Sequence, residues 1–233
     1  MWWSIPFLHL GGAAAAAGTC EKTTIGKIAA VTAPAVIVLG ERKGTLPDLA
    51  RARRVTLALQ AVRAEHQDVL DTYSRGEVSI ETMPAAIAWE TSWGFPFEVY
   101  APLIATARGR GDQPGVKLVA IGGDYLPRPP DQTLTLPPGY ITVLADGMGE
   151  SPVPVELETP FVEFVAWNER QLAERALAAW DGTGVLVIVV DRFHVEGGMG
   201  VAWEAQSLTD APVSAALLAT ADGQCYTGDR ALP

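Results

Sequence analysis

The sequence has little of what a metal-based or disulfide-based fold requires. Its 233 residues include two cysteines, Cys20 and Cys225, and three histidines, and no cysteine pair has CxxC spacing. A structural zinc site needs clustered cysteine and histidine ligands, so the sequence argues against one. A serine nucleophile in a G-x-S-x-G turn is absent, and the glycines at 197–200 lack the spacing of a dinucleotide-binding loop.

Positive charge is also scarce. Seventeen lysines and arginines face 27 aspartates and glutamates, which gives a formal net charge of −10. An acidic surface repels phosphate backbones, so nucleic acid is not an expected partner. With 48% hydrophobic and 19% charged residues, a chain of this length can bury one large core, and a single domain is predicted.

The first 19 residues contain no charged side chain and end in alanines, glycine and threonine. An apolar core with a small-residue end is typical of an export signal, although the basic start is missing. We interpret residues 1–20 as a signal or anchor, 21–34 as a linker and 35–233 as the folded domain. In an exported chain, Cys20 and Cys225 are expected to form a disulfide, unless Cys20 is lipidated.

Continuous apolar, β-branched runs predict strands that are buried on both faces. Six such runs occur, at 35–39, 55–59, 116–121, 140–144, 185–190 and 215–219. Helical spacing of apolar residues predicts helices at 79–92, 97–108 and 168–180, the last beginning with a capping-box-like pair of Asn168 and Gln171. Proline and glycine mark 122–139 and 145–160 as loops. Alternating strands and helices predict an α/β fold with a mainly parallel sheet and flanking helices.

Polar residues follow three of the predicted strands, at Glu41, Gln60 and Asp191–His194. Ligands of parallel sheets bind beyond the carboxyl ends of the strands, so these residues are candidates for one rim. For any one of them, exposure to solvent at a strand end is the commoner explanation. The aromatic run from Trp89 to Tyr100 is consistent with an apolar ligand cleft, and more often such a run is core packing.

Several segments together resemble the ChaN-like haem-binding lipoproteins. The string WETSWGFPFEVYAPLI at 89–104 is similar to the family's W…WGFPW-x-x-Y-x-P-[IL] segment. Three weaker similarities follow the family's order, namely VIVLGER at 36–42, Gln67, Leu70 and Gly76 within 65–76, and FHVEGGMGV at 193–201.

The resemblance implies an α/β fold, bacterial export to the periplasm or a membrane-tethered location, and haem or iron-related binding. It also implies kinship with the Tiki-type metalloproteases and the erythromycin esterases, which use Glu and His. Haem ligation in the family is thought to use tyrosine, and no tyrosine of this chain maps onto a family motif.

This chain departs from the family pattern where chemistry is expected. Lys43 stands in place of a histidine, Gln60 in place of a glutamate, and Asp191 in place of a glycine. A protonated lysine is a poor metal ligand and glutamine cannot act as a general base, so a non-enzymatic protein is predicted. The helix expected between the first two strands is reduced to 44–53, which predicts an apolar sheet face that a partner, a second copy or the N-terminal segment must cover.

The leading hypothesis is therefore a non-enzymatic extracytoplasmic protein that acts as a binding or structural subunit of a protein complex. Haem binding for iron uptake is the first alternative, and a metal-dependent hydrolase is the second. The candidate ligand-rim residues are Glu41, Lys43, Gln60, Trp93, Tyr100, Asp191, His194 and Glu196.

Overall fold

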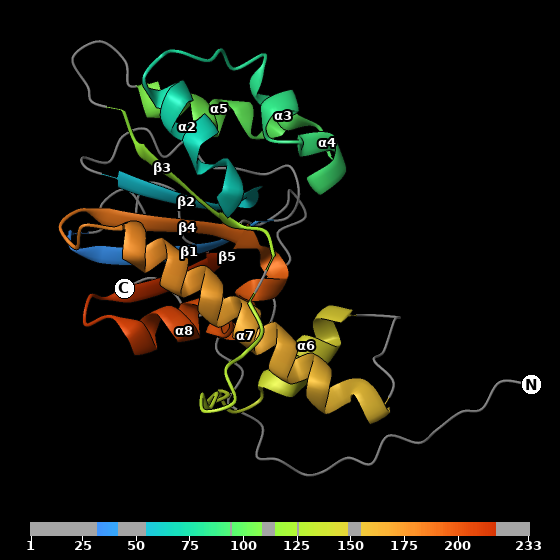
Figure 1. The fold of residues 1–233 in the computed structure, drawn as a ribbon. Coiled ribbons are helices and arrows are strands. Elements are labelled where there is room, and N and C mark those ends of the chain that lie inside the picture. The colour runs from blue at the N-terminus through green and yellow to red at the C-terminus, as the bar shows by residue number, and fades with distance from the viewer. Residues whose placement is uncertain are drawn as a thin grey trace, which may run out of the picture.

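A five-stranded parallel sheet forms the centre of the molecule. The computed structural model describes residues 32–41, 55–93, 95–108, 115–124, 126–148 and 155–217. The strands are β1 (Ala35–Glu41), β2 (Val55–Arg63), β3 (Lys117–Gly122), β4 (Val185–Asp191) and β5 (Val213–Leu217). Their order across the sheet is β3-β2-β4-β1-β5, and all neighbours are parallel (Figure 1). The predicted fold class is confirmed.

The strands have continuous apolar sequences because helices cover both faces of the sheet. In β4, the six residues from Val185 to Val190 are all buried. Alternate side chains along β4 enter opposite cores, so that Val187 joins the cluster on one face and Leu186 the cluster on the other. A sequence that alternated apolar with polar residues would leave one of these two cores unfilled.

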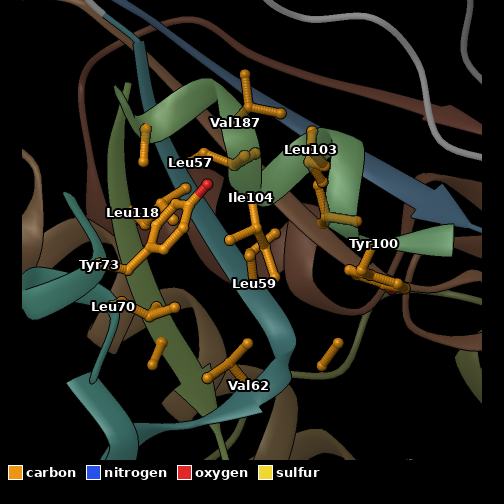
Figure 2. Close-up of a cluster of buried hydrophobic side chains, with 14 of the residues drawn as sticks. Leu57, Leu59, Val62, Leu70, Tyr73, Tyr100, Leu103, Ile104, Leu118 and Val187 are labelled. Atoms are coloured by element: carbon orange, nitrogen blue, oxygen red, sulfur yellow. The ribbon is translucent and has the colours of Figure 1, made fainter. Parts of the chain in front are cut away.

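Short helices pack on the first face, above the sheet in Figure 1. They are η1 (Ala64–His66), α2 (Gln67–Ser74), α3 (Met83–Ala86), α4 (Trp89–Ser92), η2 (Phe97–Val99), α5 (Ala101–Ala105) and η3 (Thr106–Arg108). Figure 2 shows Leu57 and Leu59 of β2 against Ile104 and Leu103 of this layer. Trp89 anchors the layer, since its ring contacts Phe95, Phe97 and Tyr100.

The 25-residue helix α7 (Val155–Ala179) and the shorter α8 (Val201–Leu208) pack on the second face. Beyond the sheet, α6 (Tyr140–Met148) and the first half of α7 enclose a separate small core. Its buried members are Tyr140, Leu144, Val162, Val165 and Ala166. We call this region, comprising 126–148 and 155–167, the α6–α7 lobe. The turns η4 (Arg192–His194) and η5 (Glu196–Gly198) connect β4 to α8 and touch the lobe.

The outer side of β3 is occupied by side chains from two helices. The Gln67 amide donates through Nε2 to Leu118 O (3.0 Å) and accepts from Ala120 N through Oε1 (2.7 Å). Arg175 donates to Ile121 O and Gly122 O. Gln67 thus makes the pair of backbone hydrogen bonds that a sixth strand would make.

Most predicted elements are confirmed, but one predicted strand is a helix, one predicted helix begins earlier, and one predicted helix is divided. Residues 140–144, predicted as a strand, form the first half of α6, because they pack on the lobe rather than in the sheet. The helix predicted to begin at Asn168 begins at Val155, inside a predicted loop. The predicted helix at 79–92 is two short helices separated at Ala88, which has a φ of +50°.

The strand segments 36–39 and 55–59 show no exposed apolar strip. Every apolar side chain in them is at most 5% exposed, while residues 42–54 lie outside the described part. The large exposed apolar side chains of the described residues are instead Leu126, Ile141 and Phe164, all in the α6–α7 lobe. Within the described ranges, no helix is both long enough and apolar enough to span a bilayer. The prediction that a partner, a second copy or the N-terminal segment covers a sheet face is not tested by the described residues and stays a prediction.

Candidate ligand site at the carboxyl edge of the sheet

The chain leaves the sheet in opposite directions at two neighbouring strands. From β2 it continues into η1 and α2 on the first face, whereas from β4 it continues through η4 and η5 into α8 on the second face. Parallel sheets bind ligands outside the carboxyl ends of strands that diverge in this way. The ends of β2 and β4 therefore mark the candidate site.

A histidine and a carboxylate form the centre of this site. His194 Nδ1 lies 3.2 Å from Glu169 Oε1, and the two side chains are 15% and 2% exposed. A carboxylate only accepts hydrogen bonds, so Nδ1 carries the proton and donates it. In the neutral ring this leaves a lone pair on Nε2, which makes no hydrogen bond within the described part of the chain.

Tyr140 completes a three-residue arrangement with this pair. Its hydroxyl donates to Glu169 Oε2 at 2.6 Å, and its side chain is buried in the small core of the lobe. Burial, and then the nearby Glu169 carboxylate, raise the pKa of Tyr140 far above its usual value. The phenol therefore stays protonated and acts as a donor, so Glu169 accepts one hydrogen bond on each oxygen.

Gly200 lets the backbone pass close to the dyad of His194 and Glu169. Its φ is +58°, and a Cβ at this position would lie 2.3 Å from His194 O and 2.8 Å from Glu169 Oε1. Neither the backbone conformation nor the space admits a side chain. Glycine here allows the start of α8 to lie directly against His194 and Glu169.

A second buried carboxyl group lies one helix away. Glu204 of α8 is 5% exposed and accepts from Arg170 Nη1 at 3.2 Å. Burial raises the pKa of Glu204, while Arg170 opposes this shift. Arg170 also donates to Glu174 at 2.8 Å, so its charge is directed toward α8 and the end of α7 rather than toward Glu169.

Three further residues of the predicted rim surround η4. Gln60 Oε1 accepts from Asp191 N at 2.7 Å, which joins the ends of β2 and β4. The Asp191 carboxylate accepts from Phe193 N at 3.1 Å and caps η4, and Glu196 pairs with Arg192. The structure thus brings Gln60, Asp191, Glu196 and His194 to one edge.

The other candidates are not brought to this group. Trp93 and Tyr100 pack in the core on the first face, away from the α7–α8 layer. The backbone of Glu41 pairs with Asp191, but its side chain, like the whole of Lys43, lies outside the described residues. Cys20 and Cys225 lie outside them as well. No cluster of three metal-ligating side chains is found in the described ranges.

Two members of the site, Glu169 and Tyr140, were not among the predicted residues. Glu169 falls in the first turn of the helix predicted at 168–180 and Tyr140 falls in a predicted strand, so neither is a candidate from the sequence alone. A signal for Glu169 exists in the sequence: the apolar stripe of Leu172 and Ala176, extended back by one turn, reaches Val165 and Glu169. A carboxylate on a buried helix face needs a partner.

Together, these features define an α/β protein with a parallel sheet and a histidine–carboxylate site at its carboxyl edge. The comparisons make the class more specific. A family model described as haem-binding uptake, Tiki superfamily, ChaN matches residues 42–122. The chain also resembles the solved structure "Cofacial heme binding to ChaN of Campylobacter jejuni", with a TM-score of 0.63 and 15% identity over 83% of this chain and 84% of that chain. The predicted ChaN-like resemblance is confirmed.

The matched segment contains Gln60 and the aromatic run, and it ends before Tyr140, Glu169 and His194. The similarity of the second half of the chain is therefore one of fold. No curated protein sequence matches this chain significantly.

Proposed function

We propose that this chain binds haem, with His194 as the iron ligand. The family model is described as haem-binding uptake, and the similar solved protein binds haem. One observation on this chain carries the proposal: His194 has its Nδ1 held by a buried carboxylate, while its Nε2 has no partner among the described residues.

The chemistry of this donor set suits haem. Histidine nitrogen is a common axial ligand of haem iron. A ligating histidine usually donates its second ring N–H to a carboxylate or carbonyl, which fixes the tautomer and orients the ring. Glu169 does this for His194. Haem, when bound, supplies an iron centre that the chain lacks, and the chain supplies the oriented imidazole.

Tyr140 fits the role of iron ligand poorly, although the family resemblance implies a tyrosine. Its side chain is 5% exposed and its hydroxyl already donates to Glu169. Ligation by tyrosine requires the phenolate, and the raised pKa of Tyr140 disfavours that form. In this conformation, His194 is the better donor.

Apolar side chains near the dyad suit a porphyrin. The ring of Phe193 meets that of His194 edge to face, with centroids 5.3 Å apart. Phe161, Phe193 and Met199 are only partly buried where they pack on the small core of the lobe, and Ile141 of α6 is exposed. A macrocycle is largely apolar and would shield such side chains from water.

No catalytic step is proposed for this chain. Gln60, which replaces a glutamate of the family pattern, is 8% exposed and uses its amide oxygen to hold the end of β4. The uncharged residues 1–19 and the similarity to a haem-binding uptake family support an extracytoplasmic location. Membership of a protein complex stays a prediction, for which the exposed apolar residues of the lobe are the motive.

The proposal is tested by titrating the chain with haem and measuring the absorbance at about 400 nm. The wild type is expected to bind haem stoichiometrically, and His194→Ala is expected to weaken binding at least about tenfold, because it removes the imidazole that would bind the iron. His66→Ala is the matched control, because His66 is also mostly buried and lies in η1 on the other face. Binding that is absent, or that is unchanged by His194→Ala, would contradict the proposal.

A further inference from the structure

The two oxygens of the Glu169 carboxylate are divided between two donors. Oε1 accepts from His194 at 3.2 Å and Oε2 accepts from the Tyr140 hydroxyl at 2.6 Å. The bond to the phenol is the shorter one and has the length of a charge-assisted O–H···O⁻ hydrogen bond. More of the carboxylate charge is therefore neutralised at Tyr140 than at His194.

We propose that Tyr140 is a positioning residue that limits, through Glu169, how much electron density His194 donates to a bound iron. The inference rests on the proposed haem site and assigns a role to a residue that does not touch the iron. It concerns the strength of the ligand rather than its presence.

The physical basis is competition for one negative charge. A carboxylate that accepts a hydrogen bond from the second ring N–H of a ligating histidine increases the basicity of the ring. The ring then donates more electron density to the metal. Stronger donation stabilises ferric relative to ferrous iron and so lowers the reduction potential. A second donor on the same carboxylate weakens this effect. The Tyr140 phenol is such a donor, and its burial keeps water from replacing it.

No other side chain within the described residues is positioned to take this role. Hydrogen bonds to the Glu169 carboxylate come from His194 and Tyr140. Arg170 donates to Glu174 and Glu204, and Arg192 donates to Glu196. At Gly200, a Cβ would lie 2.8 Å from Oε1, so no side chain can be placed there beside the carboxylate. Tyr140 is therefore the group whose removal changes the carboxylate without touching the ligand.

Two substitutions are expected to act in opposite directions on the haem-bound chain. Tyr140→Phe removes the competing donor, so the reduction potential should fall and the iron–histidine stretching frequency of the ferrous form should rise. Glu169→Gln removes the negative charge, so both quantities should move the other way. Tyr73→Phe is the control, since Tyr73 is equally buried in the other core and contacts Arg108.

If these substitutions only destabilised the fold, the reduction potential and the stretching frequency would shift in the same direction in both variants, or would not shift. Either result overturns the inference, as does a Tyr140→Phe potential equal to that of Tyr73→Phe. Retention of haem by Tyr140→Phe separates these results from a loss of the site itself.

The ligand-free chain gives an independent measurement. Nuclear magnetic resonance of ring protons and nitrogens should find the His194 proton on Nδ1. In Tyr140→Phe its resonance should move downfield, because the bond to Glu169 strengthens, and in Glu169→Gln it should move upfield. If the wild type bound no haem, the proposed function would fail, while these shifts would still decide whether Tyr140 controls the carboxylate. An unchanged resonance in Tyr140→Phe contradicts the inference.

Discussion

Gly200 combines two constraints that can be separated by mutation. Its φ of +58° disfavours any side chain, and a Cβ would also collide with His194 O and Glu169 Oε1. Gly182 has a φ of +74° and open space around it, so it carries the first constraint alone. We expect Gly182→Ala to cost about 1–2 kcal/mol of unfolding free energy and Gly200→Ala about 3 kcal/mol or more.

Urea denaturation of both variants measures this difference. The excess cost of Gly200→Ala combines the clash with His194 O and Glu169 Oε1 and the strain of its ψ of −129°, and it should be accompanied by weaker haem binding. Equal costs for the two variants would show that the close approach at Gly200 contributes nothing.

Glu204 gives a residue-scale prediction of pH dependence. Burial raises its pKa, so the folded chain holds this proton more tightly than the unfolded chain. The resulting stabilisation is complete below the unfolded pKa of about 4.3 and is lost as the pH rises through the folded value. Glutamine is neutral throughout and keeps an acceptor for Arg170.

The free energy of unfolding of Glu204→Gln, relative to wild type, should therefore increase from about pH 4 to about pH 7. Denaturation series at several pH values provide the measurement. The same series on Glu163→Gln, whose partner Arg128 lies on the surface, serves as the comparison. A parallel pair of profiles for wild type and Glu204→Gln would contradict the raised pKa.

At the scale of elements, Gln67 links α2 to the outer strand β3 through two backbone hydrogen bonds. Gln67→Ala leaves Leu118 O and Ala120 N without these partners and should cost about 1–3 kcal/mol. It also uncovers a strand edge, which favours pairing between chains. Denaturation and sedimentation velocity should show lower stability and concentration-dependent association.

Asp71→Ala is the control for that experiment, since Asp71 accepts from Gln67 Nε2 (2.9 Å) and makes no hydrogen bond to β3 within the described residues. It should change stability by less than about 0.5 kcal/mol and leave the chain's sedimentation unchanged. Association in both variants would trace the effect to α2 rather than to the strand edge.

The elements differ in how far the sequence predicts them. Runs such as 35–39 and 185–190 are buried on both faces, so their composition alone identifies them as strands. The run Tyr140–Leu144 is similarly apolar and β-branched, yet it forms a helix because its partners are α7 and η5 rather than a neighbouring strand. Tertiary contacts override local propensity there.

The site residues also differ in how far the sequence predicts them. His194 is predictable because it follows the strongest strand of the chain. Glu169 and Tyr140 reach it from segments whose structure depends on the lobe. The lobe is stabilised by contacts between residues far apart in the sequence, such as the hydrogen bond from Tyr140 to Glu169, 29 positions away. No local pattern encodes those contacts.

At the scale of the whole molecule, the described surface has its exposed apolar residues in the lobe and not on the sheet. Leu57 is fully buried, so Leu57→Lys should unfold the chain, because it places an unpaired charge in the core. Phe164 is 59% exposed, so Phe164→Lys should change the free energy of unfolding by less than about 1 kcal/mol.

Circular dichroism and sedimentation equilibrium distinguish these outcomes. If the chain self-associates through the lobe, Phe164→Lys should also reduce its solution mass. A folded Leu57→Lys variant that is smaller than wild type would instead locate the association surface at the sheet, against the burial described for β2.

The position of β4 in the sheet has a consequence for synthesis of the chain. β4 is the fourth strand in sequence and the central one in space, and β1 and β2 both pair with it but not with each other. During translation, β1 emerges from the ribosome before both of its partners, β4 and β5. It can pair only after residues 185–191 have been translated. Among the strands of the described residues, only β2 and β3 can pair before then. The nascent chain therefore carries an unpaired apolar strand through most of translation, and this exposed strand favours aggregation until β4 has been made.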